Sequence, residues 1–116
     1  MNGSESCIFC KIVRGEIGAR EEYRDEHVVA FHDLNPQAPV HVLVVPTRHA
    51  EHLSAFAAGA AEGELARLLS TAAALGTRLG RDGYRVVINE GPDGGQTVPH
   101  LHLHVLASRP MKWPPG

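Results

Sequence analysis

A row of alternating histidines near the C-terminus is the strongest chemical signal in this chain. Residues 99–110 read PHLHLHVLASRP, so that His100, His102 and His104 alternate with apolar residues. Alternation with a period of two is typical of a β-strand, whose successive side chains point to opposite faces. A strand here would place three imidazoles on one face, with neighbours roughly 6.5–7 Å apart. Such a row suits a metal, an anion or catalysis, and it also fits a partly solvated sheet face.

Two chemical interpretations of this row differ in what the imidazoles bind. Neutral imidazole is a good zinc ligand, and histidines two residues apart can share an ion, but a third one lies too far along a flat strand to join easily. Alternatively, an imidazole oriented through one nitrogen can attack phosphorus with the other, while its neighbours stabilise charge on the phosphate oxygens.

The loop before this row of histidines favours the interpretation that they bind a phosphate group. Residues 91–97 read GPDGGQT, and glycines let backbone N–H groups approach an anion closely, although the same residues also form ordinary turns. Beside Gly95, the side chains of Gln96 and Thr97 add hydrogen-bond donors.

Cys7 and Cys10 form a C-x-x-C motif, which is half of a tetrahedral metal site. The other two ligands would come from the remaining histidines. A redox pair and two small buried residues are the alternatives; the redox motif usually opens a helix in a βαβ context, which the N-terminus lacks.

Three further residues have both a functional and a plain structural interpretation. Asp33 and Asn89 follow predicted strands, where each could hold a ligand hydroxyl or simply form a turn. Trp113, between prolines, could contact a partner or pack onto its own domain.

The surrounding sequence predicts an α+β fold with an antiparallel sheet of about five strands, one short helix and one long helix. Apolar periodicity and turn residues predict the following elements: helices over 7–17 and 62–81, and strands over 20–25, 27–33, 40–46, 84–89 and within 99–107.

Length and charge limit the possible functions. A chain of 116 residues with net charge −2 fits a single domain over 1–116, with 1–6 as a flexible leader, and argues against binding a nucleic acid polymer. It has no apolar run of membrane-spanning length and no signal-peptide pattern. With only two cysteines, the chain is expected to be cytoplasmic.

The motifs together resemble the histidine triad (HIT) superfamily, and within it the Hint branch of histidine triad nucleotide-binding proteins. The segment HLHLHVL is similar to the triad motif. IFCKIVRGEI, AFHDLNPQAPVHVLVVP, GYRVVINEGPDGGQTVPHLHLHVL and MKWPPG extend the resemblance over nearly the whole chain. It implies the HIT fold and a homodimer with one continuous sheet, in which the tail 108–116 reaches the partner.

The resemblance also implies an activity, the hydrolysis of purine nucleoside 5′-phosphoramidates without a catalytic cofactor. His102 would attack phosphorus, His104 would contact phosphate oxygen, and His41 and His100 would complete and organise the histidine network. The implied nucleotide-binding positions, which would bind AMP- or GMP-type ligands, are Ile8, Phe9, Ile12, Ile17, Phe31, His32, Asp33, Leu34, Asn89, Gly95, Gln96, Thr97, His102, His104 and Trp113. Asp33 would accept hydrogen bonds from the ribose, and Thr97, where the branch usually has serine, would lie at the leaving group.

A structural zinc ion is the second implication. The cysteine pair is similar to that of many bacterial HIT proteins, which implies a closed site of Cys7, Cys10, His49 and His100. A purine nucleotide-binding or regulatory module with incidental activity, a dinucleoside polyphosphate hydrolase and a metal-dependent hydrolase are the rival functions.

Overall fold

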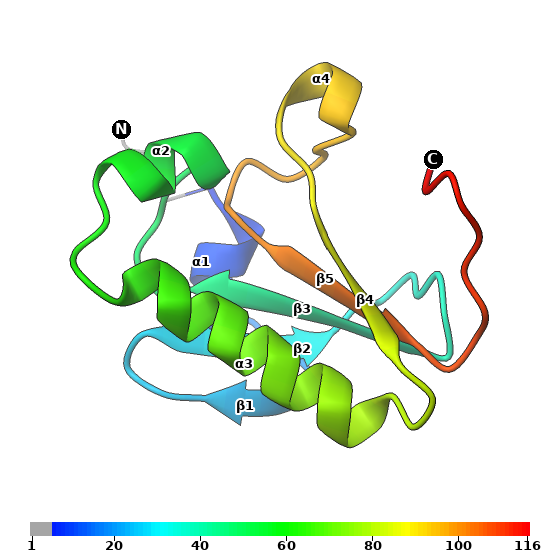
Figure 1. Ribbon diagram of the computed structural model, residues 1–116. Helices are drawn as coiled ribbons and strands as arrows, with labels where there is room; N and C mark the ends of the chain where they lie inside the picture. Colours follow the sequence, from blue (N-terminus) through cyan, green and yellow to red (C-terminus); the bar gives the residue numbers. More distant parts are fainter. Residues whose placement is uncertain (1–5) are drawn as a thin grey trace.

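A five-stranded antiparallel sheet forms the centre of the computed structural model, which describes residues 6–116. Its strands follow the order β1-β2-β3-β5-β4 (Figure 1). The bounds are β1 (Glu21–Arg24), β2 (Val28–His32), β3 (Val40–Pro46), β4 (Tyr84–Ile88) and β5 (Leu103–Ala107). The predicted α+β class and antiparallel sheet are therefore confirmed, while the predicted leader lies outside the described residues except for Ser6.

The two predicted helices are present as α1 (Ile8–Val13) and α3 (Glu64–Leu79). The α1 helix is shorter than predicted and stops just before Gly15, whose φ of 76° is easy for glycine. No helix in residues 6–116 has the length and apolar character needed to cross a membrane.

Two short helices, α2 (Leu53–Ala58) and α4 (Gly91–Gly94), are not predicted from the sequence. His52 starts α2, because its Nδ1 accepts a hydrogen bond from Ala55 N at 3.2 Å. The α4 helix replaces the predicted glycine-rich loop. It has a proline in its first turn, where the missing N–H costs nothing, and it is too short to show a helical period.

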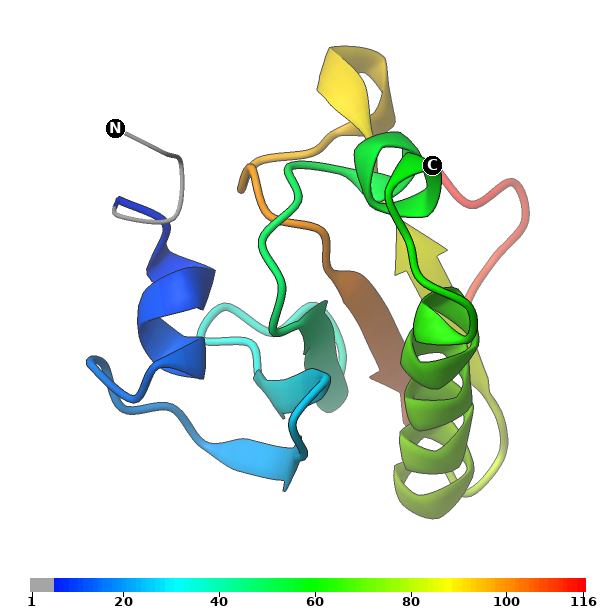
Figure 2. The ribbon, with the colours of Figure 1, turned by 90° about the vertical axis from the view of Figure 1, so that its left-hand side faces the viewer.

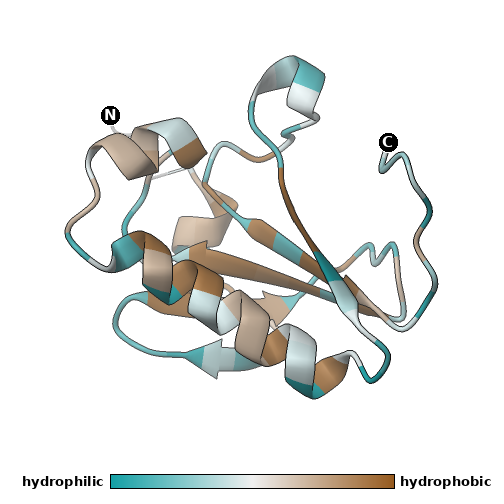
Figure 3. Ribbon diagram, in the orientation of Figure 1, coloured by the Kyte–Doolittle hydropathy of each residue, from teal (hydrophilic) through white to brown (hydrophobic). Residues whose placement is uncertain are grey.

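The sheet lies between α3 on one face and α1 on the other (Figure 2). In β3, Val42 and Val44 belong to the core under α3, and Leu43 and Val45 belong to the core near α1. This strand is hydrophobic on both faces, as its colour shows (Figure 3). Each fully buried valine contributes about 1.5–3 kcal/mol through the hydrophobic effect.

The alternating histidines do not all lie in one strand. The β5 strand begins at Leu103, so His100 and His102 precede it in a segment that bends at residues 98–100 and in which Leu101 N donates to Ala50 O at 2.8 Å. The alternation itself persists, because Leu101 and Leu103 remain in the core under α3. Outside the sheet, the His100 ring lies at the end of β3, next to the Pro46 carbonyl, and faces the cysteines of the α1 segment.

Gly76 of α3 gives a test of the packing between α3 and β4. Helix propensity alone predicts that Gly76→Ala stabilises the protein by about 1 kcal/mol. A Cβ atom there would overlap the ring of Tyr84, so we expect Gly76→Ala to destabilise by about 1–3 kcal/mol in urea unfolding. In a Tyr84→Ala background the same substitution is expected to be stabilising. Stabilisation by Gly76→Ala alone would contradict this packing.

Candidate active site and metal centre

His102 is held so that one ring nitrogen is free. Its Nδ1 lies 2.8 Å from the carbonyl oxygen of His100, and its ring packs at 78° to that of Phe9 with centroids 5.2 Å apart. A carbonyl oxygen only accepts hydrogen bonds, so Nδ1 carries the proton and Nε2 of the neutral ring keeps its lone pair. This is the arrangement needed for a nucleophile or a general base.

His41 and His104 form a hydrogen-bonded pair beside His102. Gln37 N donates to His41 Nδ1 at 3.0 Å, so His41 carries its proton on Nε2. His41 Nε2 lies 2.9 Å from His104 Nδ1 and donates its proton to that atom. Because His104 Nδ1 accepts this hydrogen bond, the neutral His104 ring carries its own proton on Nε2. The pair therefore leaves His104 with an N–H that can donate to an anion.

Burial keeps this pair uncharged at neutral pH. It lowers the pKa of His41 below its usual range, against the opposing effect of Asp33. Burial, with the nearby His102 and His41, lowers the pKa of His104 to about 4. Both rings are thus polar donors and acceptors rather than fixed cations.

A cavity of about 570 Å³ lies against these histidines. Its wall is mainly apolar, and Asp33, at the end of β2, supplies a carboxylate. The Asp33 Oδ1 atom accepts from Asn35 N at 2.8 Å, while Oδ2 lies 3.5 Å from His41 Nε2. An apolar hollow with a few polar groups at one end suits a ligand with a flat ring and a charged group.

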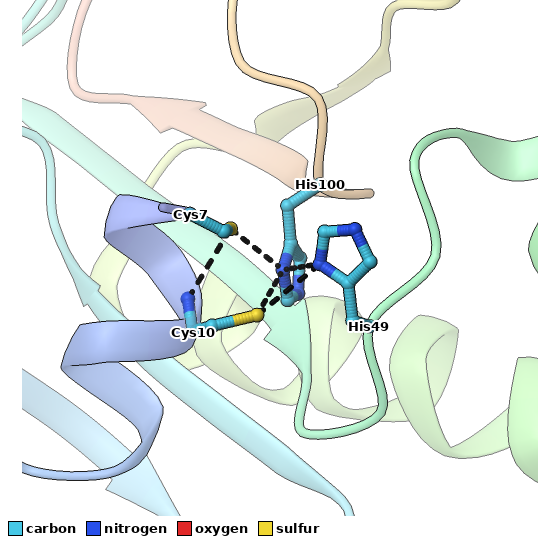
Figure 4. Close-up of side chains that lie close together, drawn as sticks. All are labelled: Cys7, Cys10, His49 and His100. Atoms are coloured by element: carbon cyan, nitrogen blue, oxygen red, sulfur yellow. Dashed lines mark hydrogen bonds between the residues drawn. The ribbon is translucent and has the colours of Figure 1, made fainter. Parts of the chain in front are cut away.

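A second cluster brings together Cys7, Cys10, His49 and His100 (Figure 4). Cys7 precedes α1 and Cys10 lies in its first turn, which places both sulfurs on the side that faces His100. The four possible ligand atoms lie within 4.8 Å of one another. Three segments distant in the sequence therefore meet at one point.

This second cluster fits a tetrahedral zinc ion. The distance is 3.3 Å from Cys7 Sγ to His100 Nδ1, 3.2 Å from Cys10 Sγ to His49 Nδ1, and 3.2 Å between the two Nδ1 atoms. Tetrahedral zinc with sulfur and nitrogen ligands implies separations of about 3.4–3.8 Å. His100 Nε2 lies 3.0 Å from the carbonyl oxygen of Pro46, so the proton resides there and Nδ1 keeps a lone pair for a metal.

The pKa of the Cys10 thiol also favours a metal ion at this cluster. Burial and the neighbouring Cys7 raise the pKa of Cys10 to about 11. A buried thiolate is therefore costly without a cation, and a divalent metal ion supplies the missing charge.

The group of Asp33, His41 and His104 is close enough for a metal but fits one poorly. Because the Gln37 amide donates to His41 Nδ1, the neutral ring has its proton on Nε2, where a metal would have to bind. The two histidine clusters thus differ in proton placement: the cluster with the cysteines has the bare Nδ1 of His100, whereas in the other the nitrogen between the rings of His41 and His104 carries a proton.

Comparison with known protein families identifies the family of this chain. A family model described as HIT domain matches residues 14–111. This chain belongs to the HIT domain family.

Three relatives show how far the HIT similarity extends. The 14 kDa zinc-binding protein of Zea mays is 45% identical over 116 residues, which cover 94% of this chain and 87% of that protein. The crystal structure of a HIT family hydrolase from Legionella pneumophila Philadelphia 1 has a TM-score of 0.85 at 41% identity, covering 95% of this chain and 99% of that one. The histidine triad nucleotide-binding protein from Candida albicans has a TM-score of 0.78 at 30% identity, covering 93% and 82%. The HIT fold expected from the sequence is therefore confirmed.

Most HIT positions expected around a nucleotide line the cavity. Its wall includes Ile8, Phe9, Ile12, Ile17, Phe31, His32, Asp33, Leu34, His41, Thr97, His102 and His104. The fold thus assembles these positions from the α1 segment, from β2, β3 and β5, and from the loop before β5. Nucleotide binding by them stays a prediction.

Other expected residues lie outside the cavity wall as it is described for residues 6–116. Asn89 Nδ2 donates to Gly94 O at 2.6 Å, Gly95 ends α4, and Gln96 Nε2 donates to Val98 O at 2.9 Å. These contacts shape the loop that brings Thr97 to the cavity. His100 faces the metal cluster and contacts the site through its carbonyl group.

The expected role of Trp113 at a partner subunit stays a prediction. Its side chain is 82% exposed, and Arg85 Nη2 holds the tail by donating to Lys112 O at 3.0 Å. The tail therefore has contacts with its own sheet.

The sequence does not reveal the backbone groups that orient the histidines. The Gln37 amide and the Pro46 carbonyl act through the main chain, which leaves no signature in residue type.

Acid titration tests the buried state of His104. Its pKa of about 4 in the folded protein lies below the value of about 6.5 in an unfolded chain, so the unfolded chain binds more protons between these pH values. The stability that this provides is complete above pH 6.5 and is lost as pH falls toward 4. We expect His104→Asn to lose less unfolding free energy than the wild type between pH 7.5 and 5. Equal losses of unfolding free energy in the two proteins, measured by urea unfolding, would contradict this. Release of a bound metal at low pH would affect both proteins alike, so it would not produce a difference between them.

Proposed function

We propose that this protein is a Hint-type hydrolase that cleaves the P–N bond of purine nucleoside 5′-phosphoramidates. The observation that carries the proposal is the hydrogen bond from His102 Nδ1 to the carbonyl oxygen of His100, which leaves Nε2 free at the wall of an apolar cavity. Two relatives support it, since one is a HIT family hydrolase and the other a histidine triad nucleotide-binding protein.

The reaction proceeds in two displacements at phosphorus. Nε2 of His102 attacks the α-phosphorus, the P–N bond breaks, and the amine leaves with its electron pair and takes up a proton. Water then attacks the same phosphorus, the His102–phosphorus bond breaks, and a nucleoside monophosphate is released. One P–N bond and one water molecule are consumed, and His102 returns to its original state.

The neighbouring groups stabilise the charge that develops on phosphate. The His104 N–H donates to a phosphate oxygen, and His41 holds that tautomer. Thr97 offers a hydroxyl at the cavity wall for the leaving group. Asp33 accepts from the ribose hydroxyls, and the apolar wall holds a purine base such as that of AMP or GMP.

The proposed assembly is a homodimer in the cytoplasm, with the sheet continued across the two subunits. The β4 strand lies at one edge of the sheet, and its residues 85–88 are only half-buried. An edge strand with half-buried valines and isoleucine favours pairing with a second copy. The tail 108–116 then lies next to that edge, where it can reach the partner.

The proposed metal is one structural zinc ion held by Cys7, Cys10, His49 and His100. The bare Nδ1 atom of His100 and the buried thiols support it, and one curated relative carries the name zinc-binding protein. When bound, zinc supplies the positive charge that stabilises the thiolates and ties the α1 segment to the sheet.

Loss of the nucleophile is the first test of this function. We expect His102→Asn to lower turnover of an adenosine 5′-phosphoramidate at least about 10³-fold while AMP still binds, because the attacking nitrogen is gone. Mass spectrometry of wild-type protein mixed with substrate should detect a nucleotidyl adduct on His102. Unchanged turnover by the variant would contradict the mechanism, and wild-type binding without turnover above background would favour a nucleotide-binding module.

Metal analysis tests the zinc centre separately. We expect about one zinc per chain in the wild type and in His102→Asn, and none in the Cys7→Ser/Cys10→Ser double variant. The double variant should lose about 2 kcal/mol or more of stability, equivalent to a fall in Tm of about 8 °C. Loss of zinc in His102→Asn, or its retention in the cysteine variant, would contradict the ligand set.

A further inference from the structure

The backbone of Gln37 connects the C-terminal tail to the histidine pair. Its N–H donates to His41 Nδ1 at 3.0 Å, and its carbonyl oxygen accepts from Arg109 Nε at 2.9 Å. Figure 1 shows the loop between β2 and β3 and the start of the tail side by side at one end of the sheet. One residue of the main chain is thus held at both of its polar groups.

The position of the Gln37 amide decides what the pair presents to the cavity. With this N–H on Nδ1, His41 donates from Nε2 and His104 presents an N–H donor. If the amide moved away, the pair could adopt the reverse arrangement, with His41 protonated on Nδ1 and His104 protonated on the nitrogen between the rings. His104 would then present a lone pair, which repels a phosphate oxygen.

The loop that carries Gln37 is exposed and needs an anchor. Residues 34–37 are exposed, and their hydrogen bonds include short-range ones, from Gln37 Nε2 to Asn35 O and from Asn35 N to Asp33 Oδ1. Arg109 is a partner from a distant part of the sequence. It follows directly from β5, the strand that carries His104, after a bend at Ser108 with φ of 72°.

We propose that Arg109 is a positioning residue, which fixes the proton positions of the His41–His104 pair by holding the backbone of Gln37. The Arg109 side chain lies where the tail begins, and two successive hydrogen bonds through the backbone of Gln37 connect it to the pair. The consequence for turnover rests on the proposed phosphoramidate hydrolysis, whereas the proton positions can be observed without any substrate.

Nitrogen NMR of the histidine rings measures this directly. Long-range ¹H–¹⁵N spectra of the zinc-loaded, histidine-labelled protein distinguish a protonated from a bare ring nitrogen. In the wild type we expect protons on Nε2 of His41 and His104, and on Nδ1 of His102. In Arg109→Met, which keeps the length of the side chain without the donor, the first two rings should become mixtures of tautomers while His102 keeps its proton on Nδ1.

Four variants separate this role from a general effect on folding. Arg109→Lys, which retains a donor, should restore the wild-type signals in part. Arg85→Ala, which removes another contact between arginine and the tail, should leave the tautomers of both rings unchanged. Gln37→Ala keeps the backbone amide and should resemble the wild type, whereas Gln37→Pro removes it and should resemble Arg109→Met.

Kinetics complete the test. We expect kcat of Arg109→Met on an adenosine 5′-phosphoramidate to fall by up to about tenfold, in proportion to the population of molecules in which His104 has lost the donor to the phosphate, with KM changed less than about twofold. Wild-type tautomers in Arg109→Met would overturn the proposal. If the tautomers shift but even the wild type shows no turnover, the proposed function fails and the positioning role stands.

Discussion

Three of the central histidines, His41, His100 and His102, each depend on one backbone group that decides which ring nitrogen carries the proton, and His104 takes its proton position from His41. The Pro46 carbonyl leaves Nδ1 of His100 bare, the His100 carbonyl leaves Nε2 of His102 bare, and the Gln37 amide leaves His41 protonated on Nε2. A carbonyl only accepts and an amide only donates, so these assignments follow from main-chain geometry. Chemically identical side chains thereby present different atoms: a bare Nδ1, a bare Nε2 and an N–H donor.

His100 joins the two sites in a single residue. Its ring faces the cysteines and His49, while its carbonyl oxygen orients His102. The α1 segment serves both sites as well, because Cys10 belongs to the metal cluster and Phe9 packs against the rings of His100 and His102. Fastening this segment to the sheet therefore also forms a wall of the cavity, so the cluster and the cavity share one structural element.

Much of this could be predicted from sequence pattern. The valine-rich run of β3 and the alternation around His102 predicted strands, because a strand presents every second residue to the same side. The strand boundary at Leu103 and the short helix at Gly91–Gly94 could not be predicted. The segment before β5 leaves the sheet through a hydrogen bond to Ala50, and one helical turn has no period to detect.

The sequence by itself determined which chemistry is available: imidazoles in alternation, a thiol pair and a carboxylate at a strand end. Its resemblance to the HIT family also predicted which residues belong to each site. Only the tertiary structure decided how each imidazole is used, because that depends on contacts between the main chain and residues far apart in sequence. Every residue has a backbone carbonyl and every residue except proline has a backbone N–H, so folding alone places those of Pro46 and Gln37 against His100 and His41.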